Sequence, residues 1–161
     1  MDEPTSAIRV PDLSGRRFNL TVERNFPVSA TSLYKAWTQR FELWFAAPGS
    51  VLMRPEGNAP FFFETEFKFE SHSVAQRHPH YGRFLQLVPD QLVQLTWVTG
   101  AGGTEGAETV VTVELKANAA RTHLRLAHEG FATEAARNQH EHAWPTVLEH
   151  LEKRLVQSSA A

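Results

Sequence analysis

A stretch of ten residues, 61–70, constrains the fold more than any other part of this chain. Positions 61, 63, 65, 67 and 69 carry phenylalanine or threonine, while positions 64, 66, 68 and 70 carry glutamate or lysine. Because successive side chains of a strand point to opposite faces, this alternation gives one apolar face and one charged face. That division is typical of an antiparallel sheet with one face in water.

Other segments with strand-like patterns are separated by turn residues. They are residues 17–26, 51–54, 81–88, 92–98, 108–116 and 121–128. Residues 89–91 and 118–120 have the composition of short hairpin connections. We therefore expect a curved, mainly antiparallel sheet of about six to seven strands.

Two short helices are expected after the first strand. Pro27 ends that strand, and Ser29 is a suitable N-cap for a helix over residues 30–38. A second helical piece over residues 41–45 ends before Pro48 and Gly49.

A long helix is expected near the C-terminus, over residues 133–156. Its apolar stripe consists of Trp144, Val147, Leu148, Leu151 and Leu155. Pro145 lies within the stripe, so we expect either a kink or two helices that meet near residues 142–144.

These elements predict an α+β fold in which the sheet wraps around the long helix. A chain of 161 residues suits one hydrophobic core better than two. We expect a flexible arm at residues 1–16, one domain at 17–157 and a flexible end at 158–161.

Composition excludes several classes of function. The net charge of −2, without any cluster of Lys and Arg, argues against nucleic acid or an anionic membrane surface as partner. The absence of cysteine excludes disulfides, thiolate metal sites and cysteine nucleophiles. With neither a signal-peptide pattern nor an apolar run of membrane-spanning length, the expectation is a cytoplasmic protein without a cofactor.

Four local signatures, in order along residues 18–155, carry a resemblance to a known family. They are VERNFPVS at 22–29 with KAWT at 35–38 and LWF at 43–45; YGR at 81–83 with Pro89 and LTW at 95–97; THLRLAHEGF at 122–131; and ARNQH at 136–140 before Trp144. Together they resemble the START-like, or SRPBCC, helix-grip superfamily. Within it, the chain resembles the bacterial relatives of the activator of the heat-shock-protein-ninety ATPase. Pro145 and the polar, histidine-rich residues 71–80 depart from the family's pattern.

The resemblance implies an elongated apolar pocket, which in this superfamily commonly holds lipids, polyketides or other hydrophobic molecules. In the eukaryotic activator the same domain contacts a chaperone instead. Fold alone does not decide between these uses.

The candidate ligand-binding residues are mainly aromatic. The expected walls are Trp37, Trp44, Phe45, Phe63, Phe67, Phe69, Trp97, Phe131, Trp144 and Leu148, and the expected polar groups are Tyr81, His128 and His140. The competing interpretation is ordinary core packing, since aromatic side chains fill most small domains. His128 lies on the apolar face of its strand, either as a proton-transfer candidate or as a structural histidine satisfied by backbone, and the structural role is favoured. His140 could meet it where the chain folds back.

Two further motifs are given structural rather than functional interpretations. His78 and His80 could bind zinc together with His72, but a solvated loop is the favoured interpretation and no metal is expected. The glycine-rich residues 100–106 precede a strand rather than a helix, so they predict a hairpin loop and not a phosphate-binding loop.

Three functions remain. The first is binding of a small hydrophobic ligand, lipid-like or aromatic, by a monomer or homodimer. The second is a cyclase or hydratase in which His128 handles protons. The third is a protein-interaction module of the chaperone-activator type, with a role in the stress response.

Overall fold

The computed structural model describes residues 8–67, 76–100 and 103–159. In chain order these form β1 (Phe18–Phe26), α1 (Ala30–Thr38), α2 (Phe41–Trp44), β2 (Pro60–Phe67), β3 (Gln76–Val88), β4 (Leu92–Trp97), β5 (Thr109–Asn118), β6 (Arg121–Phe131) and α3 (Glu134–Ser159). The predicted α+β class and the two short helices after the first strand are confirmed.

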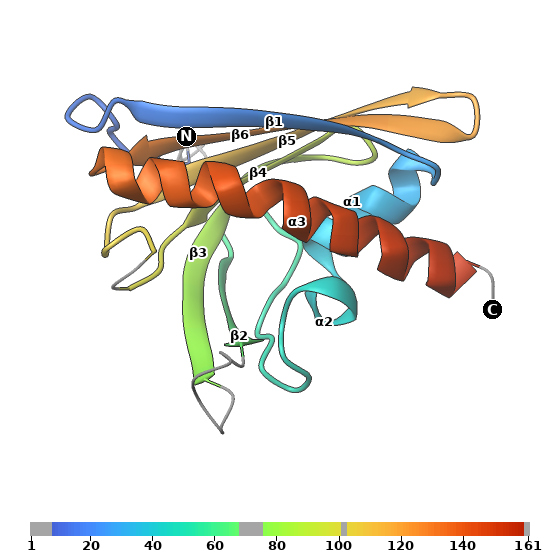
Figure 1. Ribbon diagram of the computed structural model, residues 1–161, viewed down its shortest axis with the longest axis horizontal. Helices are drawn as coiled ribbons and strands as arrows, with labels where there is room; N and C mark the ends of the chain where they lie inside the picture. The colour runs from blue at the N-terminus through green and yellow to red at the C-terminus, as the bar shows by residue number, and fades with distance from the viewer. Residues whose placement is uncertain (1–7, 68–75, 101–102, 160–161) are drawn as a thin grey trace, which may run out of the picture.

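The six strands form one curved antiparallel sheet in the order β1-β6-β5-β4-β3-β2. α3 lies across the inner face of this sheet and runs beside β1. The short helices α1 and α2 lie near the C-terminal half of α3 (Figure 1). The sheet and α3 bury the apolar side chains between them, which is the predicted helix-grip arrangement.

α1 begins where the sequence predicts. The Ser29 hydroxyl oxygen accepts a hydrogen bond from the Ser32 amide at 3.1 Å, which satisfies one of the free amides of the first turn. The predicted apolar face of Leu33, Ala36 and Trp37 is fully buried.

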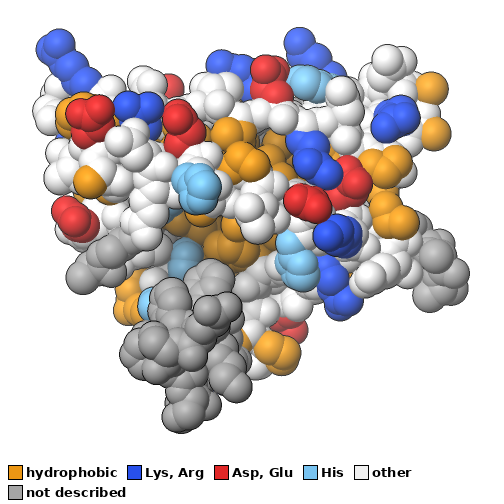
Figure 2. Space-filling view, in the orientation of Figure 1, with side chains coloured by type: hydrophobic (Ala, Val, Ile, Leu, Met, Phe, Trp, Pro, Cys, Tyr) orange, Lys and Arg blue, Asp and Glu red, His pale blue; other side chains and the backbone are white. Residues whose placement is uncertain are grey.

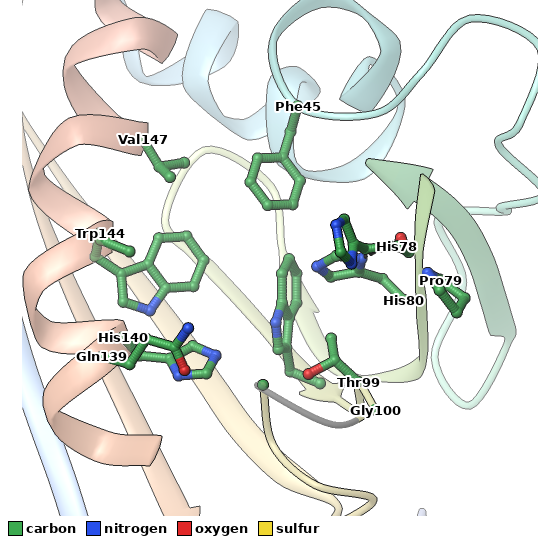
Figure 3. Close-up of a pocket in the computed structure, with 13 residues that line it drawn as sticks. Phe45, His78, Pro79, His80, Thr99, Gly100, Gln139, His140, Trp144 and Val147 are labelled. Carbon is green, nitrogen blue, oxygen red and sulfur yellow. Dashed lines mark hydrogen bonds between the residues drawn. The ribbon is translucent and has the colours of Figure 1, made fainter. Parts of the chain in front are cut away.

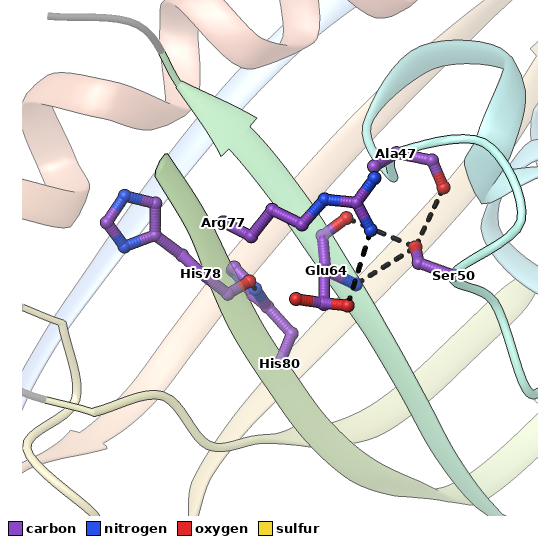
Figure 4. A network of polar contacts seen from close by, with 6 residues as sticks. All are labelled: Ala47, Ser50, Glu64, Arg77, His78 and His80. Atoms are coloured by element: carbon purple, nitrogen blue, oxygen red, sulfur yellow. Dashed lines mark hydrogen bonds and ion pairs between the residues drawn. The ribbon is translucent and has the colours of Figure 1, made fainter. Parts of the chain in front are cut away.

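β2 has the two faces that its alternation predicts. Phe61, Phe63 and Thr65 are buried, whereas Glu64 is half-buried on the other face and its carboxylate lies 3.6 Å from the Arg77 guanidinium. The Glu64 backbone amide donates to the Ser50 hydroxyl at 3.1 Å, and that hydroxyl donates to the Ala47 carbonyl at 2.7 Å (Figure 4). These bonds fasten the loop after α2 to β2.

The prediction of a strand at residues 51–54 is wrong. Only Leu52 pairs with the sheet, through an isolated bridge to Phe62. Pro55 has no amide hydrogen with which to extend the pairing, and the chain turns there instead.

The expected strand start at residue 81 is also wrong, because this strand, β3, begins at Gln76. His78, Pro79 and His80 therefore lie in a strand and not in a solvated loop. Pairing with β2 extends the strand at this end. Pro79 is tolerated because the regular ladder between β3 and β4 begins only at Phe84, so β3 has one regular neighbour here.

α3 is one uninterrupted helix that includes Pro145, so two helices meeting near residues 142–144 are excluded. The Pro145 ring is exposed, while Trp144 and Leu148 on the opposite side are buried. Burial of this stripe stabilises the helix on both sides of the proline, which offsets the missing backbone hydrogen bond.

Candidate functional site

A cavity of about 520 Å³ lies between α3, the first half of β3 and the loop that follows β4. Its lining residues are Phe45, His78, Pro79, His80, Trp97, Thr99, Gly100, Gly103, Gln139, His140, Ala143, Trp144 and Val147. In the close-up, His80 from β3 and Trp144 and Val147 from α3 face one another across this space (Figure 3). The space-filling view shows hydrophobic side chains gathered in the centre of the face, with histidines beside them (Figure 2).

His80 is a buried polar residue of the cavity wall. It lies two residues after His78, so both side chains belong to the same face of β3, and this face lines the cavity. The His80 ring stacks on Phe63 at 4.9 Å between centroids and meets the edges of Trp97 and Phe45 at 5.1 and 5.4 Å.

The environment of His80 keeps it neutral. Burial, opposed in part by a hydrogen bond to the His78 carbonyl, lowers the pKa of His80 to about 4. The His80 Nδ1 donates this hydrogen bond to the carbonyl oxygen at 3.0 Å. The residue as a whole is only 8% exposed.

His128 lies behind the cavity wall and links the ring of Trp144 to the backbone of Trp97 through hydrogen bonds. The Trp144 indole N–H donates to His128 Nδ1 at 3.1 Å. Nδ1 therefore carries no proton in the neutral ring, so Nε2 carries it and donates to the Thr109 hydroxyl at 2.8 Å. The Thr109 hydroxyl in turn donates to the Trp97 carbonyl.

This hydrogen-bonded chain holds Trp144 on α3 and Trp97 on β4 in fixed positions. His128 itself is 0% exposed. Burial, followed by repulsion from the His140 ring when that ring is protonated, lowers the pKa of His128 well below its ordinary value. Both ring nitrogens have partners within the protein. His128 is thus a structural histidine, as favoured from the sequence, but side chains satisfy it rather than backbone.

His140 meets His128, a contact that the sequence allows but does not require. The two ring centroids are 5.1 Å apart at nearly a right angle, and His140 also contacts Phe131 at 4.8 Å. His140 Nδ1 donates to the Ala136 carbonyl one turn earlier at 2.8 Å. Burial is the main cause that lowers the pKa of His140.

The structure brings only some of the predicted site residues to the cavity. Phe45, Trp97, His140 and Trp144 line it directly. A second layer is packed against them without reaching the cavity; it consists of Trp37, Trp44, Phe63, His128, Phe131 and Leu148.

Three predicted positions do not contribute described side chains to the cavity. Tyr81 is a correction: it is 49% exposed and packs against Phe62 on the outer face, because it is one step out of phase with His80. The backbone of Phe67 belongs to β2, but its side chain lies outside the described part. Phe69 lies outside the described residues altogether.

Thr99, Ala143 and Val147 line the cavity although the sequence did not mark them as site residues. Thr99 and Thr104 exchange hydrogen bonds, with the Thr104 amide donating to the Thr99 hydroxyl at 2.7 Å and the Thr99 amide donating to the Thr104 hydroxyl at 2.8 Å. This pair fixes the glycine-containing loop against the cavity. Ala143 and Val147 lie four residues apart on α3, so they share one face of the helix, and Val147 is three residues from Trp144. This spacing is the signal that could have placed them at the site.

The described residues contain no group of three or more histidine, aspartate or glutamate side chains arranged to hold a metal ion. His72, the third member of the zinc interpretation, lies outside them. The helices of the described ranges also include none that is long and apolar enough to cross a membrane.

The sheet, the enclosed helix and the cavity between them define a helix-grip protein of the START-like class. The model of the family named Activator of Hsp90 ATPase homolog 1-like protein matches residues 27–156, and the chain belongs to this family. No curated protein matches the sequence.

Solved structures with the same fold come from several bacteria. A protein from Rhodobacter sphaeroides is 22% identical, with a TM-score of 0.69 and coverage of 95% of this chain and 99% of that chain. A protein from Mesorhizobium loti is 22% identical, with a TM-score of 0.66 and coverage of 86% and 97%. CalU16 from Micromonospora echinospora is 17% identical, with a TM-score of 0.62 and coverage of 88% and 82%. At these identities the likeness establishes the fold alone.

Proposed function

We propose that this chain binds a small, mainly apolar, ring-containing molecule in the cavity between α3 and β3. The observation that carries the proposal is the cavity itself, whose volume of about 520 Å³ remains beside a densely packed aromatic cluster. Pockets for small ligands commonly enclose about 300–1,000 Å³ and combine apolar walls with a few polar groups. Here Phe45, Trp97 and Trp144 supply rings, and His80 and His140 supply polar groups.

Core packing alone does not account for this site. The rings behind the cavity, such as Trp37 and Phe63, are completely buried and do not line it. The lining side chains instead border open volume, and burial of an apolar guest there would be favourable by about 25 cal/mol per Å² before ordering costs.

Native mass spectrometry of freshly purified protein, followed by solvent extraction, tests this proposal. We expect an extra mass of roughly a few hundred daltons, which is what a cavity of this size holds. Ala143→Trp should remove it, because the indole would occupy the cavity that Ala143 lines. Ala135→Trp is the matched control, since Ala135 is exposed on α3 and away from the cavity. Equal extra mass in both variants would contradict the proposal.

One observation supports a protein-interaction module as the second candidate. Leu52, Phe62 and Tyr81 pair across the outer face of the sheet, where Leu52 is 70% and Tyr81 49% exposed. A clean protein mass, together with stimulation of a heat-shock-protein-ninety ATPase that Tyr81→Glu abolishes, would favour this candidate over ligand binding.

A further inference from the structure

Two of the three histidines that line the cavity, His80 and His140, have the same protonation pattern. A carbonyl oxygen can only accept a hydrogen bond, so the ring nitrogen facing it must be the donor. His80 Nδ1 faces the His78 carbonyl at 3.0 Å, and His140 Nδ1 faces the Ala136 carbonyl at 2.8 Å. A neutral imidazole carries one proton, so in both rings Nε2 is left with a lone pair.

Both rings are neutral at physiological pH. Burial lowers the pKa of His80 to about 4 and lowers that of His140 below its ordinary value. The titratable groups around them on the packed elements are His78 on β3 and His128 on β6, and His128 is buried with a pKa lowered in the same direction.

The lone pairs are directed away from the backbone. Nδ1 is next to the side-chain attachment and is held against the local carbonyl, whereas Nε2 is at the far end of the ring. For His80 and His140, Nε2 has no hydrogen-bond partner among the described residues. Figure 3 shows the two rings on opposite sides of the cavity, one from β3 and one from α3.

The described residues that line the cavity supply no counter-charge for an anion. Within the described part of the chain, no Lys, Arg, Asp or Glu side chain lines the cavity. An anionic guest would therefore lose its hydration without gaining a counter-charge, and its oxygens would face nitrogen lone pairs. The hydroxyl of Thr99 and the amide of Gln139 remain available at the loop and helix margins.

Building on the proposed function, we infer that the cavity selects planar aromatic molecules that carry a neutral hydrogen-bond donor, such as an aromatic hydroxyl or a ring N–H. The donor is accepted by Nε2 of His80, with Nε2 of His140 as the second acceptor. The ring of the guest lies among Trp97, Phe45 and Trp144. A guest of the same shape without a donor leaves a buried acceptor unpaired, which disfavours its binding.

Three probes with the same ring system separate these possibilities. They are 2-naphthol, which has a neutral donor; 2-methoxynaphthalene, which has none; and 2-naphthoate, which is an anion. Isothermal titration calorimetry with the intact chain near neutral pH gives a dissociation constant for each. We expect 2-naphthol to bind about tenfold more tightly than the ether, because one buried hydrogen bond is gained. The carboxylate should bind most weakly.

Two variants assign the acceptor. His80→Phe retains a ring that can stack on Phe63 and should bring 2-naphthol to within about twofold of 2-methoxynaphthalene. His140→Phe, at a half-buried position, should reduce the preference in part. His142→Phe is the control on the same helix, because His142 is exposed and outside the cavity.

The outcomes separate this inference from the proposed function. Equal binding of all three probes, tightest binding of the carboxylate, or an unchanged preference in both cavity variants would overturn donor selection while the binding function stands. Failure of all three probes to bind would overturn the proposed function and the selection with it.

Discussion

His128 illustrates how much a buried polar residue contributes by position alone. It connects the indole of Trp144 to the hydroxyl of Thr109, and through that hydroxyl to the backbone of Trp97. The three partners come from α3, β5 and β4. A hydrogen-bonded group this well buried gives one defined arrangement to the two indoles of the cavity wall.

Replacing His128 by leucine should destabilise the protein by about 2–4 kcal/mol. The substitution leaves the buried Trp144 N–H without a partner, which costs about 1–3 kcal/mol. It also removes the hydrogen bond that the Thr109 hydroxyl accepts, worth about 0.5–1.5 kcal/mol, while the bond from that hydroxyl to the Trp97 carbonyl remains. Urea denaturation near neutral pH measures the change. His142→Leu, at an exposed position of α3, should stay within about 0.5 kcal/mol of the parent. A similarly small change for His128→Leu would refute the structural role assigned here.

The free energy of unfolding should decrease as the pH falls from about 7 to 5. His80 has a folded-state pKa of about 4, whereas an unperturbed histidine has a pKa of 6.5, so the unfolded chain binds its proton first. The contribution of neutral His80 to the free energy of unfolding is therefore fully present above pH 6.5 and is lost as the pH falls towards 4. For His80 alone the loss is about 2 kcal/mol at pH 5, and His128 and His140 act in the same direction.

Urea titrations of the wild type and His80→Phe at several pH values isolate this contribution. The variant should show a shallower pH dependence over the same interval. Parallel curves for the two proteins would show that His80 titrates alike in the folded and unfolded states.

At the scale of elements, β3 determines the shape of the site because it pairs with β2 at one end and β4 at the other. Where the two pairings meet, Gly82 lies opposite Phe61, and a Cβ atom there would lie 2.2 Å from the Thr96 carbonyl. The two neighbouring strands approach the backbone too closely for any side chain.

Gly82→Ala should therefore destabilise the sheet beside the cavity by about 1–3 kcal/mol, the range for overpacked sites. The nearest atoms belong to backbone and to a buried ring, so they cannot move aside cheaply. Thermal unfolding checks this result, with Gly15→Ala as control because a Cβ at Gly15 meets nothing within 4 Å. An unchanged melting temperature for Gly82→Ala would mean that the strands are less tightly apposed than described.

For the whole molecule, the sequence predicts the architecture well and the site only in part. Period-two and helical patterns identify which faces are buried, as for Phe63 and Leu148, and burial then determines the layers. β3 begins earlier than predicted because pairing with β2, a tertiary interaction, outweighs the weak strand preference of polar residues and Pro79.

The cavity is harder to predict because it depends on volume that side chains leave unfilled. Trp37 and Trp144 are both tryptophans on the apolar face of a helix, yet only Trp144 borders the cavity. The difference depends on how α1, α3 and β4 pack together, which local patterns do not encode. The sequence feature that pointed to the cavity wall is the pair of histidines at positions 78 and 80, since residues i and i+2 share a face once the segment is extended.

The clustering of the aromatic rings also has an optical consequence. All four tryptophans of the chain form one connected group, with centroid separations of 5.0 Å from Trp37 to Trp44, 6.0 Å from Trp37 to Trp144 and 5.6 Å from Trp97 to Trp144. Rings this close exchange excitation energy, so the emission of the entire protein originates beside the cavity. The chain thus contains its own unlabelled reporter, and a molecule entering the cavity would change the intrinsic fluorescence of the protein as a whole.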